Sequence, residues 1–375
     1  MAVKIVRQDS RIALLGAPMS AAALAPGGEG APAAFRKAGL VSKLQSIGFE
    51  VVDMGDDALQ VYQEDSDSPR ARNLPRVLAG LEALKPRVEI AAKSGALPLI
   101  LSGDCSIALA VMAGLRRYFR HVSLLYADAD ADLQTPATTT SGCVDGMVTS
   151  HLIGRGASEM VRFWSEPPLV REPDLALFGV SRLDPAEEQA LQISPLRRYL
   201  AEDIRRKTPV KAATEAVERI HGNAHEFVLH FDVDVIAGFQ STNLPSSGGL
   251  SPVAVREAFE VFATQKQLAA IEVTGYNPER DADGSGVMQI VEFLGDLLAI
   301  RKEKVKNATV VAKAAATESP KAPLVEAPAV AGGDAWSSDV LEGVSAEPAE
   351  TSGGEALDVE DSSGSGLGEA EEPQP

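Results

Sequence analysis

The sequence is poor in cysteine, in basic charge and in long apolar runs, and each shortage excludes a class of protein. Cys105 and Cys143 are the two cysteines in 375 residues, too few for a disulfide framework, so a reducing, cytoplasmic setting is expected. Acidic residues outnumber basic ones by 53 to 35, and no nucleic-acid partner is expected because such binding needs a basic stripe. No apolar run reaches the ~18 residues that would span a membrane, so no membrane partner is expected either.

The end of the chain differs in composition from the rest. From residue 311 onward the sequence consists mostly of Ala, Pro, Ser, Gly and acidic residues, with almost no aromatic side chains. A segment of this kind cannot bury enough apolar surface to order itself. The prediction is a folded domain over residues 1–310 and a disordered acidic tail over residues 311–375.

Short apolar segments alternate with helical patterns along the folded part. Seven segments are strand candidates: residues 11–17, 50–55, 97–103, 122–130, 175–180, 226–234 and 268–274. Five segments have helical patterns: residues 31–48, 74–95, 106–119, 251–265 and 289–306. Strands that are apolar on both faces and alternate with helices form a buried parallel sheet. The expected fold is α/β, a three-layer α-β-α domain with a mostly parallel sheet of about eight strands.

Aspartates gather directly after these strand candidates. Asp128, Asp130 and Asp132 follow the apolar run VSLLYA, and alternation along an extended chain would place all three on one face. Further acids after apolar strands are Asp104, Asp232 and Asp234. Ligands in parallel α/β folds bind at the carboxyl ends of the strands. Three unpaired carboxylates on one face would repel one another, so either a cation lies among them or they fan out into water.

Two motifs resemble other kinds of site. DADAD resembles the start of an EF-hand calcium loop, but Leu133 and Thr139 stand where that loop requires Gly and Glu. LHFDVDVI (229–236) resembles the strand-end DxD of haloacid-dehalogenase-like phosphatases, although that motif normally comes first in its fold and here several strand candidates precede it. A phosphatase therefore stays open as an alternative.

Sequence support for a histidine-activated nucleophile is weak. None of the five histidines lies inside an acid-bearing loop. His230 stands between Leu229 and Phe231 in a strand pattern, so we expect it to be a buried neutral histidine and not a catalyst.

Several acid-bearing and glycine-rich segments follow one another in a distinctive order. They are SGDCSIALA (102–110), YADADADLQTPATTTSGCVDGM (126–147), HFDVDV (230–235), SSGGLSP (246–252) and YNPERD (276–281). Together with the opening segments 14–40 and 48–57, they resemble the arginase/agmatinase superfamily of ureohydrolases. The resemblance covers about residues 11–303.

The resemblance implies a dinuclear Mn²⁺ site in a hydrolase that cleaves a linear C–N bond of a guanidino or amidino compound, of the arginase, agmatinase or formiminoglutamase type. Carried over by position, the metal ligands are Cys105, Asp128, Asp130, Asp132, Asp232 and Asp234. Two bound ions can bridge and deprotonate a water. The family also implies a small-molecule substrate and a homotrimer or homohexamer.

The chain departs from the family pattern at the positions that carry the chemistry. Cys105 and Asp130 replace two histidine ligands, which makes Zn²⁺, Fe²⁺ or Ni²⁺ an alternative to Mn²⁺. Asp145 replaces the proton-shuttle histidine, and Gly275 replaces the glutamate that holds a guanidinium. Asp130 and Asp145 are the candidate catalytic residues. The candidate substrate contacts are Gln134, Ser141, Cys143 and Asp184. The departures leave open an alternative function, a catalytically degenerate arginase-fold protein that acts as a binding or assembly subunit.

Overall fold

The computed structural model describes residues 5–221 and 226–318, with side chains described up to residue 305. Its centre is an eight-stranded sheet, parallel throughout, with the order β2-β1-β3-β8-β7-β4-β5-β6. The strands are β1 (Arg11–Ala17), β2 (Glu50–Asp56), β3 (Leu97–Ser102), β4 (Val122–Ala127), β5 (Leu175–Val180), β6 (Arg197–Leu200), β7 (Glu226–Asp232) and β8 (Leu268–Thr274). The expected parallel α/β fold is confirmed. β6 is absent from the strand candidates because its sequence, RRYL, contains two exposed arginines and no apolar run.

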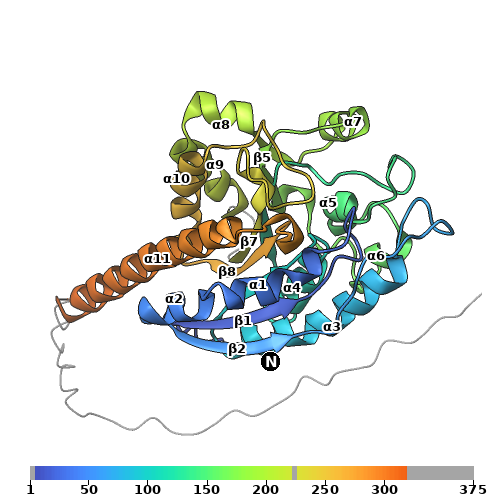
Figure 1. Cartoon of the computed structure of the whole chain (residues 1–375). Coiled ribbons are helices and arrows are strands. Elements are labelled where there is room, and N and C mark those ends of the chain that lie inside the picture. Colours follow the sequence, from blue (N-terminus) through green and yellow to red (C-terminus); the bar gives the residue numbers. More distant parts are fainter. Residues whose placement is uncertain (1–4, 222–225, 319–375) are drawn as a thin grey trace, which may run out of the picture. The chain divides into compact units, whose positions relative to one another are not determined.

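Helices pack on both faces of this sheet (Figure 1). One face carries α1 (Ala31–Lys37), α2 (Leu40–Ser46), α8 (Ala201–Lys207), α9 (Pro209–His221), α10 (Pro252–Ala263) and α11 (Ser285–Glu318). The other face carries α3 (Leu74–Lys93), α4 (Ile107–Arg116), α5 (Val148–Leu152), α6 (Ser158–Val161) and α7 (Pro185–Ile193). Within the described residues, no helix is both long and apolar enough to cross a membrane.

Alternation along the strands supplies both hydrophobic cores. In β1, Ile12 and Leu14 belong to the core on the α11 face, whereas Ala13 and Leu15 belong to the core on the α3 face. Successive strand side chains point to opposite faces, so an apolar run such as RIALLGA serves two cores at once. Each fully buried aliphatic side chain stabilises the fold by roughly 1.5–3 kcal/mol.

Two helical boundaries differ from the sequence-based expectation. The helix expected over residues 31–48 is divided at Gly39, whose φ of 85° lies in the left-handed region that ends a helix. The last helix, α11, extends to Glu318, beyond the expected domain boundary at residue 310. Most of the predicted tail, residues 319–375, lies outside the described residues.

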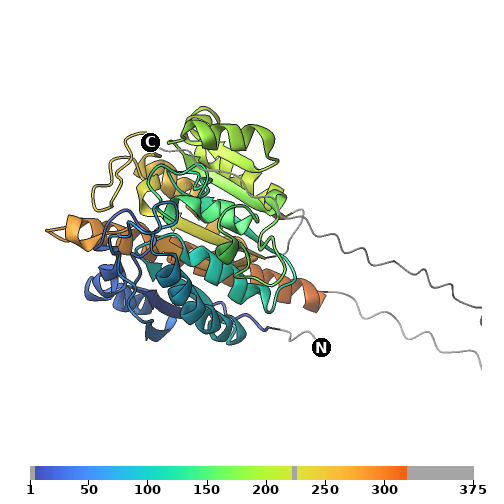
Figure 2. The same cartoon turned by 90° about the vertical axis from the view of Figure 1, so that its right-hand side faces the viewer.

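The strand order decides where the acid-bearing segments meet. β2 and β6 lie at opposite ends of the sheet (Figure 2), and the four central neighbours are β3, β8, β7 and β4. Because all strands are parallel, the segments that follow these four emerge at the same edge. Those segments carry most of the predicted metal ligands, so the topology brings them together.

Candidate metal centre

Two polar rows cross the sheet on one face beneath this edge. In the first row, Tyr126 of β4 pairs with His230 of β7, which pairs with Glu272 of β8. Two residues further along, Asp232 of β7 pairs with Thr274 of β8. Side chains two apart in a strand share a face, so His230 points the same way as Asp232.

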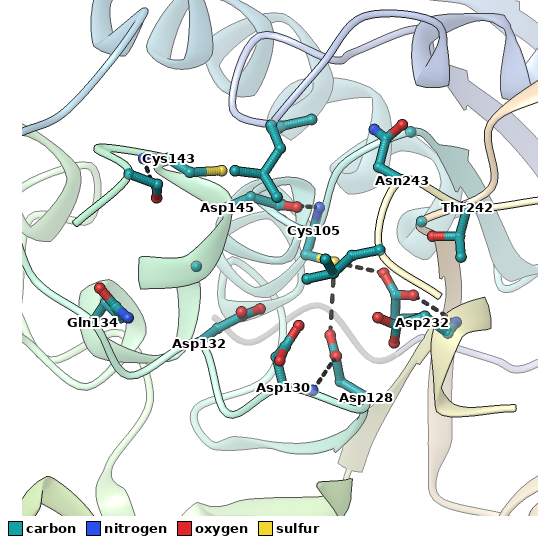
Figure 3. Close-up of a pocket in the computed structure, with 18 of the residues that line it drawn as sticks. Cys105, Asp128, Asp130, Asp132, Gln134, Cys143, Asp145, Asp232, Thr242 and Asn243 are labelled. Carbon is teal, nitrogen blue, oxygen red and sulfur yellow. Dashed lines mark hydrogen bonds between the residues drawn. The ribbon is translucent and has the colours of Figure 1, made fainter. Parts of the chain in front are cut away.

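A cavity of about 200 Å³ opens above the second row (Figure 3). Ten of the eleven predicted site residues line it: Cys105, Asp128, Asp130, Asp132, Gln134, Ser141, Cys143, Asp145, Asp232 and Asp234. Asp184 is the exception. Its Oδ1 accepts the backbone N–H groups of Ala186 and Glu187, each at 2.8 Å, and so begins α7.

The Cys105 side of the cavity is buried and closely packed. Cys105 Sγ lies 3.1 Å from Asp232 Oδ2, 3.3 Å from Thr274 Oγ1 and 3.9 Å from Asp128 Oδ2. Burial, and then the charges of Asp145 and the other carboxylates, raises the pKa of the Cys105 thiol well above its ordinary value. The thiol therefore donates its proton to Asp232 in the metal-free protein, and a bound cation would take the place of that proton.

His230 is fully buried beside Cys105. Its ring stacks on Tyr126 with centroids 4.0 Å apart, its Nε2 lies 3.2 Å from Thr274 Oγ1, and its Nδ1 faces Glu272 Oε1 at 3.7 Å. A ring nitrogen of His230, Cys105 Sγ and an Asp128 oxygen all lie within 4.8 Å of one another. His230 is buried, as the sequence predicts, but it also belongs to a potential ligand group. Its position two residues before Asp232 in β7 is the signal that could have revealed this.

The Asp130 side contains a basic residue, Arg182, from the segment after β5. Arg182 Nε and Nη2 donate to the two oxygens of Asp130 at 2.8 Å and 2.6 Å. Nη2 also donates to Asp234 Oδ2, and Nη1 donates to the Leu244 carbonyl at 2.8 Å. Burial opposes the charge on Arg182, but the bonds and charges of both aspartates outweigh it and raise its pKa. The candidate site residues predicted from sequence do not include Arg182.

Burial and the close packing of carboxylates in the cavity raise the pKa values of several of them. Burial, followed by repulsion from neighbouring carboxylates, raises the pKa of Asp128, Asp132 and Asp234 well above the ordinary aspartate value. Asp132 accepts a hydrogen bond from the Tyr126 hydroxyl. Asp145 Oδ1 accepts the Cys105 backbone N–H at 2.6 Å. Such shifts are typical of sites in which a cation or a proton must balance clustered charge.

Because residue 275 is glycine, the backbone that follows β8 can pass directly beside the Asp232 carboxylate. The φ of Gly275 is 76°, and a Cβ built on it would lie 2.2 Å from Asp232 Oδ1 and 2.4 Å from Oδ2. A side chain therefore cannot occupy this position while Asp232 keeps its place.

Comparison with known proteins assigns the chain to a family. The sequence model of the Arginase family matches residues 10–299. The chain belongs to the arginase family. Arginases from Bacillus caldovelox and Bacillus subtilis (strain 168) are 25% and 27% identical to it over 291 and 293 residues, which cover 76% of this chain and 97% and 98% of those proteins. The crystal structure of the B. subtilis arginase matches 77% of this chain and 98% of its own, with a TM-score of 0.71.

The arginase fold excludes the haloacid-dehalogenase-like fold on which the phosphatase alternative rested, since the DxD of LHFDVDVI begins at the last residue of β7 and does not follow the first strand. The donors on the Cys105 side fit a metal ion, because a thiol, an imidazole and carboxylates are all ligands of transition metals. A second ligand group comprises Asp128, Asp232 and Asp234. Neither group, within the described residues, includes Asp130 or Asp132.

Proposed function

We propose that this arginase-family chain is a metal-dependent hydrolase that cleaves a linear C–N bond in a guanidino or amidino compound. The observation that carries the proposal is the buried convergence of Cys105, His230, Asp128 and Asp232 at the carboxyl ends of neighbouring parallel strands. From the sequence, two divalent ions are expected, most simply Mn²⁺, with Zn²⁺, Fe²⁺ or Ni²⁺ as alternatives. Proteins named arginases match about three quarters of this chain in sequence and in fold.

Bound metal would supply a Lewis acid and a water of lowered pKa. Asp145 stands on the cavity wall, bonded to the Cys105 N–H, and is our candidate to pass a proton to the leaving amine. The Nε2 of Gln134 donates to Asp184, while its Oε1 has no hydrogen-bond partner among the described residues. Gln134 lines the cavity, and its amide is a candidate substrate contact in our proposal. Ser141 and Cys143 complete the same wall.

A second function is favoured by two observations, the pairing of Arg182 with Asp130 and Asp234 and the absence of a side chain at Gly275. Without an acid at position 275, the family's guanidinium contact is missing, so arginine hydrolysis at the usual rate is not expected. A catalytically degenerate subunit that binds a partner or a ligand would retain the fold and lose the chemistry.

A metal-reloading assay separates the two functions. The full-length chain would be stripped with chelator, reloaded with Mn²⁺, Zn²⁺, Fe²⁺ or Ni²⁺, and assayed for urea or ammonia release from a panel of guanidino and amidino compounds. Metal-dependent release that Asp232→Asn abolishes supports the hydrolase. Metal binding without release supports the degenerate subunit, and no binding at millimolar metal overturns the hydrolase proposal.

Two further expectations remain predictions of the proposed function. The protein is expected in the cytoplasm and as a homotrimer or homohexamer. Fractionation and analytical ultracentrifugation would test them.

A further inference from the structure

We infer that Arg182 is a built-in cation that takes the place of the second metal ion, so that this centre binds a single divalent ion through Cys105, Asp128, His230 and Asp232. The inference rests on the metal-binding part of the proposed function and changes the number of ions, the ligand set and the preferred metal. It is carried by the contacts of the carboxylate oxygens on the two sides of the cavity.

On the Asp130 side, the oxygens that a second ion would need are already bonded. Both Asp130 oxygens accept from Arg182. Asp234 Oδ2 also accepts from Arg182, and Asp234 Oδ1 accepts the Ala129 N–H at 3.2 Å. The planar guanidinium matches a carboxylate with two parallel bonds, and the Leu244 carbonyl holds its remaining Nη1.

On the Cys105 side, the atoms that face one another are potential ligands. Asp128 Oδ1 and Asp232 Oδ1 accept the N–H groups of Asp130 and Asp234, each at 2.8 Å, which fixes both carboxylates. Their Oδ2 atoms then point toward Cys105 Sγ. The contacts that a cation would displace there are hydrogen bonds from the Cys105 thiol and the Thr274 hydroxyl. A thiol can lose its proton to a metal, whereas Arg182 cannot lose its charge.

His230 completes this group through an arrangement that suits metal binding. Its Nδ1 lies 3.7 Å from the buried carboxylate of Glu272, and among the described residues neither this nitrogen nor either Glu272 oxygen has a hydrogen-bond partner. A histidine that binds metal commonly holds a carboxylate on its other nitrogen, which fixes the ring and raises its basicity. Ligand atoms of Cys105, Asp128 and His230 lie within 4.8 Å of one another, and Asp232 joins them through its 3.1 Å contact with Cys105 Sγ. In the inference these side chains supply one sulfur, one nitrogen and two oxygens, a set that favours Zn²⁺ over Mn²⁺.

The second ligand group, Asp128, Asp232 and Asp234, offers the sharpest test of the inference. It shares Asp128 and Asp232 with the four residues that we assign to the single ion, and Arg182 binds its third member, Asp234. Removing the guanidinium should therefore free Asp234 for a second ion that shares these two carboxylates with the first.

The test counts metal ions bound to the full-length chain by calorimetric titration and elemental analysis, with Zn²⁺ and with Mn²⁺. We expect one Zn²⁺ per chain in the wild type and two in Arg182→Gln, the second more weakly bound. Arg256→Gln is the matched control, because Arg256 pairs with Asp296 on the surface away from the cavity. It should bind one ion, like the wild type.

Cobalt absorption provides a second measurement that does not depend on activity. The Co²⁺-loaded wild type and Arg182→Gln should both show thiolate-to-cobalt charge-transfer absorption, and Cys105→Ser should lose it. Absence of that absorption in a wild type that binds Co²⁺ overturns the assignment of Cys105 as a ligand.

The outcomes separate this inference from the proposed function. Two ions in the wild type overturn the inference and leave the hydrolase proposal standing. A count of one in both the wild type and Arg182→Gln also overturns it, because Arg182 would then not be what excludes the second ion. No ion in either protein overturns the inference and the proposed function together.

Discussion

The Cys105 side and the Asp130 side of the cavity hold similar carboxylates but neutralise them differently. On the Cys105 side, the neighbours of Asp128 and Asp232 are a protonated thiol and a histidine, groups that can exchange a proton for a metal. On the Asp130 side, the neighbour is a guanidinium that keeps its charge at any physiological pH. The Cys105 side can therefore bind and release a metal ion, whereas the Asp130 side carries the permanent positive charge of Arg182.

The largest expected effect is on the stabilisation of the protein by bound metal. Asp232→Asn should abolish the stabilisation that metal gives to the wild type, about 4 kcal/mol when free metal is roughly 1,000 times Kd. The reason is that the metal binds the native state alone and Asp232 contacts Cys105 directly. Thermal unfolding with and without Zn²⁺ measures it. Equal wild-type melting temperatures in both conditions would show that the Cys105 side does not exchange a cation.

Removing the permanent cation should destabilise the metal-free protein. Arg182→Gln leaves the nearly buried Asp234 without its charged partner, which should lower the free energy of unfolding by about 3 kcal/mol. Adding Asp130→Asn should recover part of that loss, because one of the two unpaired charges is then gone. Urea unfolding in the presence of chelator would measure both. A loss below about 1 kcal/mol would mean that the pair behaves as an ordinary surface ion pair.

His151, which lies outside the cavity, makes its own contribution to the pH dependence of stability. This contribution must be removed before acid unfolding can be used to compare the two sides of the cavity. Burial lowers the pKa of His151 to about 4 from 6.5, and neither ring nitrogen has a hydrogen-bond partner among the described residues. The unfolded chain binds a proton between these values and the folded chain does not. Stability from His151 is therefore complete above pH 6.5 and is lost as pH falls toward 4, by up to about 3 kcal/mol. His151→Gln should remove this pH dependence, and an unchanged profile would refute the assignment.

Glu272 should tune the metal site without binding the metal. Glu272→Gln removes the charge opposite His230 Nδ1, so Zn²⁺ affinity should fall about 10–100-fold while the count stays at one. Calorimetric titration measures both quantities. Unchanged affinity would place His230 outside the ligand set, and loss of the fold would be recognised by circular dichroism before titration.

The smallest effect concerns the reactivity of the two cysteines. Metal should slow iodoacetamide labelling of Cys105, because coordination replaces its free thiol. Cys143 is the matched control, since it is also buried but donates to the Ala22 carbonyl at 2.9 Å. Its labelling rate should be the same with and without chelator. Equal rates for Cys105 under both conditions would contradict its role as a ligand.

Seven strands were predictable because buried parallel strands are continuous apolar runs. β6 was not predicted because it is a short strand at the end of the sheet, and two of its four residues are exposed arginines. The convergence of the aspartates was predictable from strand ends alone. Arg182 was not, because its bond to Asp130 joins residues 52 positions apart and depends on how the segment after β5 folds back. His230 lies between these cases, since alternation in β7 already places it beside Asp232.

Gly275 also limits how the site could be redesigned. A glutamate introduced at this position would bring its Cβ to 2.2 Å from the Asp232 carboxylate, and a left-handed backbone at a residue other than glycine adds about 1–3 kcal/mol of strain. Asp232 and the turn after β8 would have to change together with it. An engineer who wants a carboxylate here must therefore rebuild the end of β8 and cannot rely on a single substitution.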